Sequence, residues 1–148
     1  MLFSMQAKTH NLAEFQKAAQ DFILGLTPLP DHATVVGLFG DLGAGKTTFV
    51  QAAAKALGVV ETLNSPTFLI LKSYKLKASS YKLLHHIDAY RLKSFDELAR
   101  LRFDELLADP KNLILIEWAD KVTDLLPKEH LKLHLEFIND NTRAITLG

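Results

Sequence analysis

The sequence predicts an α/β protein in which helices pack on both faces of a central sheet that is partly parallel and partly antiparallel. Two short apolar runs, residues 34–39 and 113–116, are typical of buried parallel strands, and a glycine-rich loop and a helical segment follow the first run. Two further strand-like segments are separated only by a small polar turn, which favours an antiparallel hairpin. The chain has 148 residues, of which 48% are hydrophobic. It therefore has the size and composition expected of a single domain spanning residues 1–148.

The N-terminal half contains a helix, a strand and a second helix. Apolar residues recur at helical spacing over residues 11–26, and Asn11 and Glu14 have the spacing of a capping box. The apolar run at residues 34–39 predicts a buried strand. An alanine-rich helix is expected over residues 46–57, because the glycine that follows it stands where a C-terminal cap belongs.

The second half of the chain alternates strands with short helices. In order, the expected elements are strands 68–77 and 81–87, a helix opened by a capping box at Ser94 and running to Ala108, strand 113–116, a short helix at 121–126, and strands 131–138 and 144–147. Turn residues near 78–80 and at 139–141 predict that the first two and the last two of these strands form hairpins.

The segment Gly40–Thr47 matches the Walker A pattern, in which four residues separate a glycine from Gly-Lys-Thr. Glycines let backbone N–H groups approach a polyphosphate, and the helix that follows directs its positive end at the same anion. We expect the Lys46 ammonium to reach the β- and γ-phosphates and act in catalysis, and the Thr47 hydroxyl to bind Mg²⁺. The expected nucleotide contacts here are Asp41, Leu42, Gly43, Ala44, Gly45, Lys46, Thr47 and Thr48. A glycine-rich turn can precede a lysine by chance, but the strand before this loop and the helix after it favour a nucleotide-binding loop. The expected fold is therefore a P-loop NTPase-like three-layer sandwich.

Two acidic residues end predicted strands. Glu117 follows the apolar run 113–116, and we expect it to be the second Mg²⁺ ligand if that strand neighbours the strand before the loop. The structural alternative is that Glu117 simply leaves the core at a strand end. Asp88 is a candidate to orient or deprotonate an attacking water, and an equally good candidate to cap backbone groups of a loop. Residues 65–67, Ser-Pro-Thr, form a turn in which a threonine could sense the γ-phosphate.

Composition and charge limit the function classes. The chain has no cysteine, which excludes disulfides, thiolate zinc sites and cysteine nucleophiles. It has 17 basic and 17 acidic residues, so we expect RNA to enter the function only through a partner protein. No signal peptide and no apolar run of about 20 residues is present, and a soluble cytoplasmic protein is expected.

Taken together, the motifs resemble one family, TsaE, the bacterial ATPase of tRNA threonylcarbamoyladenosine biosynthesis. The matching segments are residues 40–49 (GDLGAGKTTF), 65–68 (SPTF), 86–92 (HIDAYRL) and 116–118 (IEW). The resemblance implies an Mg²⁺-dependent ATPase that works with the TsaB–TsaD pair to form N6-threonylcarbamoyladenosine at position 37 of tRNAs reading codons that begin with A. It also implies that Thr47 and Glu117 bind the metal, that Asp88 is a catalytic or switch acid, and that Trp118 belongs to the nucleotide or partner surface.

The resemblance assigns two further positions to the nucleotide. Thr9 matches a threonine near the base, and Arg143 matches an arginine that reaches the nucleotide. The alternatives are a helix cap for Thr9 and an exposed hairpin charge for Arg143. The sequence departs from the family at Ala119, where a proline is common, and at His85, an extra histidine beside the family position His86. Neither histidine has a partner at metal-ligand spacing, so no transition-metal site is expected.

Three other functions use the same loop. A small-molecule kinase would need an arginine-bearing lid, for which the candidates are Arg91, Arg100 and Arg102, although the last two also suit a solvated helix face. A regulatory GTPase would need an Asn-Lys-x-Asp motif and an Asp-x-x-Gly switch, which the sequence lacks. A nucleotide-gated binding module would turn ATP over slowly alone, with its site completed by a partner.

Overall fold

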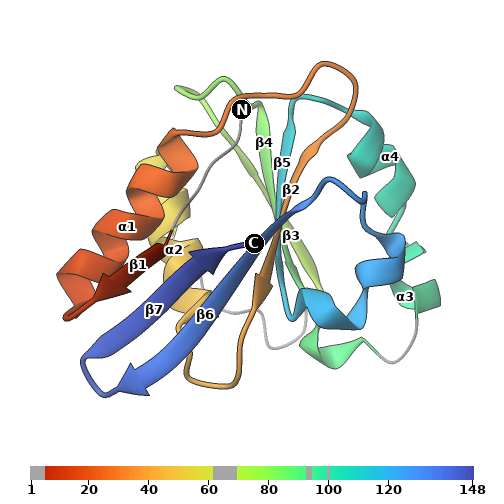
Figure 1. Ribbon diagram of the computed structural model, residues 1–148. Helices are drawn as coiled ribbons and strands as arrows, with labels where there is room; N and C mark the ends of the chain where they lie inside the picture. The colour runs from red at the N-terminus through yellow and green to blue at the C-terminus, as the bar shows by residue number, and fades with distance from the viewer. Residues whose placement is uncertain (1–5, 62–69, 93–94, 100) are drawn as a thin grey trace.

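The structure, a computed structural model, describes residues 6–61, 70–92, 95–99 and 101–148. Within them a seven-stranded sheet has the order β1-β7-β6-β2-β5-β4-β3 (Figure 1). The strands are β1 (Gln6–Thr9), β2 (Thr34–Phe39), β3 (Leu71–Lys75), β4 (Leu83–Asp88), β5 (Asn112–Glu117), β6 (Leu131–Asn139) and β7 (Thr142–Leu147). The central strands β6, β2, β5 and β4 are parallel to one another. The strand β3 pairs antiparallel with β4, β7 pairs antiparallel with β6, and β1 pairs antiparallel with β7. The predicted mixed sheet and both predicted hairpins are confirmed.

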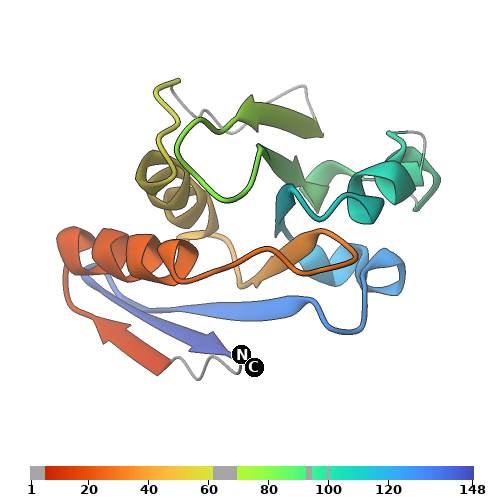
Figure 2. The ribbon, with the colours of Figure 1, turned by 90° about the horizontal axis from the view of Figure 1, so that it is seen from above.

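Helices cover the sheet from both sides. They are α1 (Leu12–Leu24), α2 (Lys46–Ala56), α3 (Phe95–Ala99) and α4 (Phe103–Ala108), with 3₁₀ turns η1 (Ala89–Arg91), η2 (Ala119–Lys121) and η3 (Thr123–Leu125). The helices α1 and α2 lie side by side on one face, whereas α3, α4 and the turns after β5 lie on the other (Figures 1 and 2). The three layers of the predicted sandwich are therefore present. None of the helices in the described ranges has both the length and the apolar character needed to cross a bilayer.

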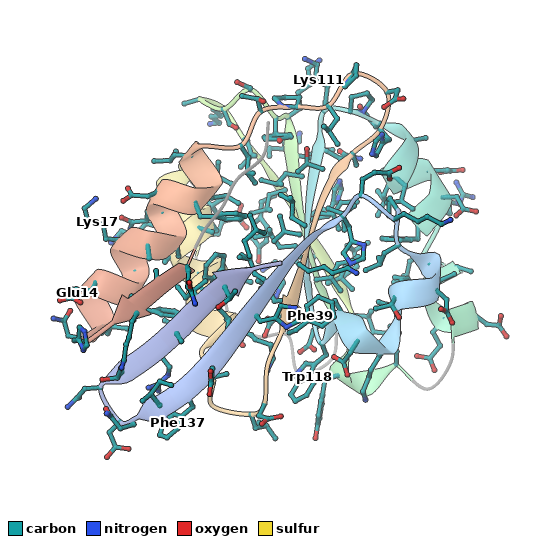
Figure 3. All side chains as sticks on the ribbon, viewed as in Figure 1. Glu14, Lys17, Phe39, Lys111, Trp118 and Phe137 are labelled. Carbon is teal, nitrogen blue, oxygen red and sulfur yellow. The ribbon has the colours of Figure 1, made fainter. Side chains whose placement is uncertain are left out.

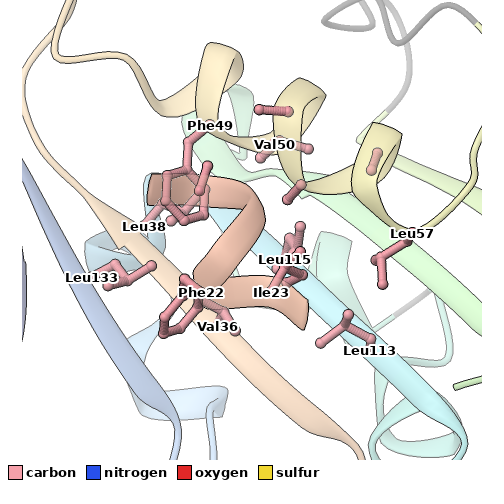
Figure 4. Packing of buried hydrophobic residues seen from close by; sticks show 14 of the residues in the cluster. Phe22, Ile23, Val36, Leu38, Phe49, Val50, Leu57, Leu113, Leu115 and Leu133 are labelled. Carbon is pink, nitrogen blue, oxygen red and sulfur yellow. The ribbon is translucent and has the colours of Figure 1, made fainter. Parts of the chain in front are cut away.

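Each face of the sheet has its own apolar core, and β5 contributes to both. Leu113 and Leu115 point toward α1 and α2, where they join Phe22 and Phe49 (Figure 4). Ile114 and the next alternate residue, Ile116, point toward α4 and the turns after β5. Because both faces are buried, the strand is apolar from Leu113 to Ile116, as the sequence predicted, and polar residues stand only at its two ends, Asn112 and Glu117.

The strand β1 was not predicted from the sequence. It is a short edge strand with alternating exposed and buried residues, and its four residues carry no apolar pattern. The structure also corrects the alternative role of Thr9 as a helix cap. The cap of α1 is Asn11, whose side chain accepts a 2.8 Å hydrogen bond from the Glu14 backbone N–H. The Glu14 carboxylate in turn accepts a 2.9 Å hydrogen bond from the backbone N–H of His10, so the expected capping by Asn11 and Glu14 is confirmed, with the return bond one residue before the cap.

The single helix expected from Ser94 to Ala108 is wrong: the chain forms α3 and α4, and Ser94 lies outside the described residues. Arg102 separates the two helices with a left-handed backbone, φ 57°. Leu98 and Phe103 are both buried in the same core cluster. On one straight helix these two side chains would point about 140° apart, because each residue turns the helix by about 100°. The break brings both to the core.

Other expected elements are shorter or different. The helix expected at 121–126 is wrong, since two 3₁₀ turns, η2 and η3, occupy this region. The strand expected over 68–77 is observed as β3, Leu71–Lys75, and residues 68–69 lie outside the described part of the chain. The turn at residues 65–67 also lies outside it.

Candidate nucleotide and metal site

The glycine-rich loop joins the end of β2 to the start of α2, at the carboxyl edge of the parallel strands (Figure 1). Gly45 is the N-cap of α2 with φ 105°, and a Cβ there would lie 2.9 Å from Cζ of Phe15. A Cβ on Gly40 would lie 2.5 Å from the Leu135 carbonyl oxygen. These two positions need glycine for backbone conformation and for space. The loop therefore lies closely against α1 and β6 while α2 starts with its amide groups directed at the loop.

The other loop residues differ in exposure. Asp41, Leu42 and Gly43 are exposed, with the Leu42 side chain 77% exposed at the tip, whereas Ala44 is buried. Thr48 is half-buried on α2. The exposed tip is the part of the loop that a triphosphate can approach from solvent.

The Lys46 side chain folds back onto its own loop. Its Nζ donates hydrogen bonds to the Gly40 carbonyl and, at 2.9 Å, to the Asp41 carbonyl. The same nitrogen lies 3.8 Å from the centroid of the Trp118 ring. Burial lowers the pKa of Lys46, and the nearby carboxylates, Glu117 first among them, oppose this shift. The ammonium is thus held among acceptors at the site where a phosphate is expected.

Thr47 and Glu117 meet across the loop. The strands β2 and β5 are parallel neighbours, with Leu38 paired with Glu117. A metal role for Glu117 requires this neighbouring position. The Thr47 hydroxyl donates a 2.7 Å hydrogen bond to Oε1 of Glu117, which is 2% exposed. A hydroxyl oxygen and a carboxylate oxygen are hard donors of the kind Mg²⁺ prefers. These residues fit the proposed metal site by chemistry and by position.

Asp88 ends β4, and the sheet register pairs it with Glu117. Its Oδ1 accepts a 3.0 Å hydrogen bond from the backbone N–H of Tyr90 and caps the turn η1. The backbone-capping contact expected as the alternative role of Asp88 therefore exists. The Asp88 carboxylate also lies at the same edge of the sheet as the glycine-rich loop. The ring of Tyr90 lies 5.0 Å, centroid to centroid, from that of Trp118.

Trp118 connects this edge to the loop lysine. It follows Glu117 with a left-handed backbone, φ 57°, which is uncommon for a large residue. The indole ring contacts Lys46 and the Tyr90 ring. Trp118 and Phe137 lie at the end of the sheet where the loop is, and Lys111 lies at the opposite end (Figure 3). The left-handed backbone at Trp118 thus changes the direction of the chain after β5, at the residue whose ring contacts Lys46.

A cavity of about 170 Å³ adjoins the loop between α1 and the β6–β7 hairpin. Its lining residues are Asn11, Leu12, Phe15, Gly45, Thr48, Asp140, Asn141 and Arg143. Arg143 donates to the carbonyls of Asn139 at 2.7 Å and Thr142 at 3.1 Å, and its guanidinium lies 4.5 Å from the Phe137 ring centroid. Arg143 is thus held by its own hairpin at a position beside the glycine-rich loop.

Thr9 is near this cavity but its side chain is buried. The register pairs Thr9 with Arg143, and the Thr9 hydroxyl donates to the Arg143 carbonyl at 3.4 Å. Sequence reasoning missed Asn11, Asp140 and Asn141 as lining residues, because its only signals there were a helix cap and a turn. Arg102, one candidate for a kinase lid, lies between α3 and α4. Its side chain is exposed, and its guanidinium lies 3.9 Å from the Glu105 carboxylate.

A larger cavity, of about 260 Å³, lies at the other end of β2. It is lined mainly by apolar residues of the segments before β2 and around the start of β6, together with His32, Glu129 and His130. It contains no part of the glycine-rich loop. The smaller cavity is therefore the better candidate for a nucleotide, because it opens directly beside Gly45 and Thr48.

Comparison with known proteins finds relatives along most of the chain. The family model described as threonylcarbamoyl adenosine biosynthesis protein TsaE matches residues 8–145. Relatives named tRNA threonylcarbamoyladenosine biosynthesis protein TsaE include one from Bacillus subtilis, 40% identical over 76% of this chain and 67% of its own, and one from Rickettsia bellii, 34% identical over 99% and 96%. The crystal structure of Bacillus subtilis YdiB superposes with a TM-score of 0.77 at 31% identity, covering 99% of this chain and 86% of that one. The chain belongs to the TsaE family.

Proposed function

We propose that this chain is a single P-loop ATPase domain that binds and hydrolyses ATP with Mg²⁺ in the formation of N6-threonylcarbamoyladenosine at position 37 of tRNAs reading codons that begin with A. The observation that carries the proposal is the 2.7 Å contact between the Thr47 hydroxyl and the Glu117 carboxylate at the start of α2. It joins the two oxygen donors that a Walker A site uses for its metal.

The residues around this contact have distinct roles in the proposal. Backbone N–H groups of the loop and the start of α2 bind the phosphates, and the Lys46 ammonium leaves its loop carbonyls to contact the β- and γ-phosphates. A Mg²⁺ ion held by Thr47 and Glu117 would neutralise charge that develops on the phosphate oxygens. Asp88 orients or deprotonates the attacking water, since it ends the strand next to that of Glu117. The nucleoside occupies the cavity beside Gly45 and Thr48, where Arg143 contacts it and Thr9 supports the Arg143 backbone.

The tRNA context comes from family membership. Relatives that cover most of this chain are named for threonylcarbamoyladenosine biosynthesis. The proposal takes TsaB–TsaD as the protein partner and a cytoplasmic location, with tRNA reached only through that pair. The balance of 17 basic and 17 acidic residues supports indirect contact with RNA, because proteins that bind RNA alone are commonly basic.

Steady-state hydrolysis tests this function. ATP turnover is measured for the chain alone and with TsaB–TsaD, and we expect slow turnover that the pair stimulates. Thr47→Val should abolish the stimulated turnover, whereas Thr47→Ser keeps the hydroxyl and should retain it. Fast turnover that ignores TsaB–TsaD would contradict the proposal, as would a preference for GTP or stoichiometric phosphorylation of a small acceptor.

A further inference from the structure

His86 makes a contact to which the function above gives no role. It lies on β4, 2% exposed, and its Nε2 is 2.6 Å from Oε2 of Glu117. An ionised carboxylate only accepts hydrogen bonds, so Nε2 carries the proton and donates. The contact is diagonal across two parallel strands, since the register pairs His86 with Leu115, two residues before Glu117.

The two oxygens of Glu117 are therefore engaged by two different elements. Oε1 accepts from Thr47 on α2, and Oε2 accepts from His86 on β4. With one oxygen fixed by a side chain from the neighbouring strand, rotation of the carboxylate about its last bond is restricted. The oxygen that faces Thr47 then stays directed at the loop.

The imidazole has little other reason to be buried here. Its Nδ1 is buried and has no hydrogen-bond partner among the residues that the structure describes. Burying an unpaired polar nitrogen is unfavourable, and an apolar side chain of similar size would avoid that cost. The polar contact that the described residues offer in return is the bond to Glu117.

We propose that His86 is a positioning residue that orients the Glu117 carboxylate for Mg²⁺. The proposal rests on the function proposed above. Hydrogen-bond partners of metal-ligating carboxylates commonly change metal affinity about 10- to 100-fold when they are removed. His86 acts through Glu117 and contacts neither the nucleotide nor the metal in this scheme.

The neighbouring histidine provides a matched control. His85 lies on the same strand and is 3% exposed, but it points to the opposite face of the sheet, where its Nδ1 lies 2.7 Å from the Ser73 hydroxyl. Replacing either histidine disturbs a buried position of β4. Only replacement of His86 removes a bond to Glu117.

The test is calorimetric binding of a non-hydrolysable ATP analogue, with saturating Mg²⁺ and with EDTA, so that no turnover is needed. The quantity compared is the Kd in EDTA divided by the Kd with Mg²⁺, which measures how much the metal strengthens binding of the analogue. Four variants are measured beside the wild type: His86→Leu, His86→Gln, His85→Leu and His85→Gln. Gln can present an N–H near the place of Nε2, so His86→Gln tests rescue of the donor.

We expect His86→Leu to reduce the Mg²⁺-dependent ratio about 10- to 100-fold while the Kd in EDTA stays near that of wild type. His86→Gln and both His85 variants should keep the wild-type ratio. If His86→Leu does not fold, His86→Asn replaces it with the same expectation, because its amide is too short to reach Glu117.

Two results overturn the inference in different ways. A wild-type ratio in the His86→Leu or His86→Asn protein, or an equal loss in His85→Leu, removes the positioning role but leaves the proposed ATPase intact. A wild-type protein that binds the analogue equally well with Mg²⁺ and with EDTA contradicts the metal site itself, and with it both proposals.

Discussion

Gly45 is the position where the loop conformation can be tested most directly, by replacement with alanine. Its φ of 105° lies where a Cβ is unfavourable, at about 1–2 kcal/mol. The new Cβ would also lie 2.9 Å from Cζ of Phe15, a ring that is 3% exposed and packs edge-on against Phe49 at 6.2 Å between centroids. Because that ring has little room to move, overpacking adds about 1–3 kcal/mol. We expect Gly45→Ala to lower the free energy of unfolding by about 2–5 kcal/mol.

The neighbouring Gly43 separates the two contributions. It also has a left-handed backbone, φ 82°, but a Cβ there would meet nothing within 4 Å. Gly43→Ala should therefore lose only the backbone part, about 1–2 kcal/mol. Urea denaturation measures both variants, together with Phe15→Leu and the double variant Phe15→Leu/Gly45→Ala. In the Phe15→Leu background the alanine at position 45 should cost about as much as Gly43→Ala.

The reasoning is refuted if Gly45→Ala is no more destabilising than Gly43→Ala, or if Phe15→Leu leaves the cost of the alanine unchanged. Either result would mean that the loop does not pack against α1 as described. The same preparations can be tested for binding of the ATP analogue, where Gly45→Ala should bind more weakly because it shifts the backbone at the start of α2.

Three further predictions concern the residues around the loop. Lys46→Met should abolish binding of the ATP analogue in calorimetry without unfolding the protein. Because burial lowers the pKa of Lys46, the free energy of unfolding of the wild type should rise as the pH increases from that lowered pKa toward 10.5. The Lys46→Met variant should lack this rise. Wild-type analogue affinity in Lys46→Met would contradict the phosphate role. Asp88→Asn keeps an oxygen that can accept from the Tyr90 N–H, so it should keep the wild-type stability while its rate of ATP hydrolysis falls about 10²-fold or more. Asp88→Ala should lose the same activity and also about 1 kcal/mol of stability. Equal hydrolysis by Asp88→Asn and the wild type would leave Asp88 with only the capping role. Trp118 is the one tryptophan of the chain, so its fluorescence should change when the analogue draws Lys46 from the indole ring, and an unchanged spectrum at saturation would show that the contact persists.

Much of the fold was predictable because its signals are local. The two-sided burial of β2 and β5 requires continuous apolar runs, and the Asn11 capping box is formed by residues three apart. The failures have equally physical reasons. The strand β1 is stabilised by pairing with β7, the last strand of the chain, and four residues at an edge show little pattern of their own. The break at Arg102 exists because Leu98 and Phe103 must reach one core, which is a demand of packing.

The site divides in the same way. By itself the sequence determined the Walker A motif and its place between a strand and a helix, because the motif consists of glycines, a lysine and a threonine at fixed spacing within one short segment. It also marked Glu117 and Asp88 as acids at strand ends. Only the tertiary structure decided that β5 is the neighbour of β2, which brings Thr47 to Glu117 across 70 positions of sequence, and that β4 follows next, which brings His86 to the other oxygen. Strand order and register depend on which apolar faces bury one another over the whole chain, and no single motif contains that information.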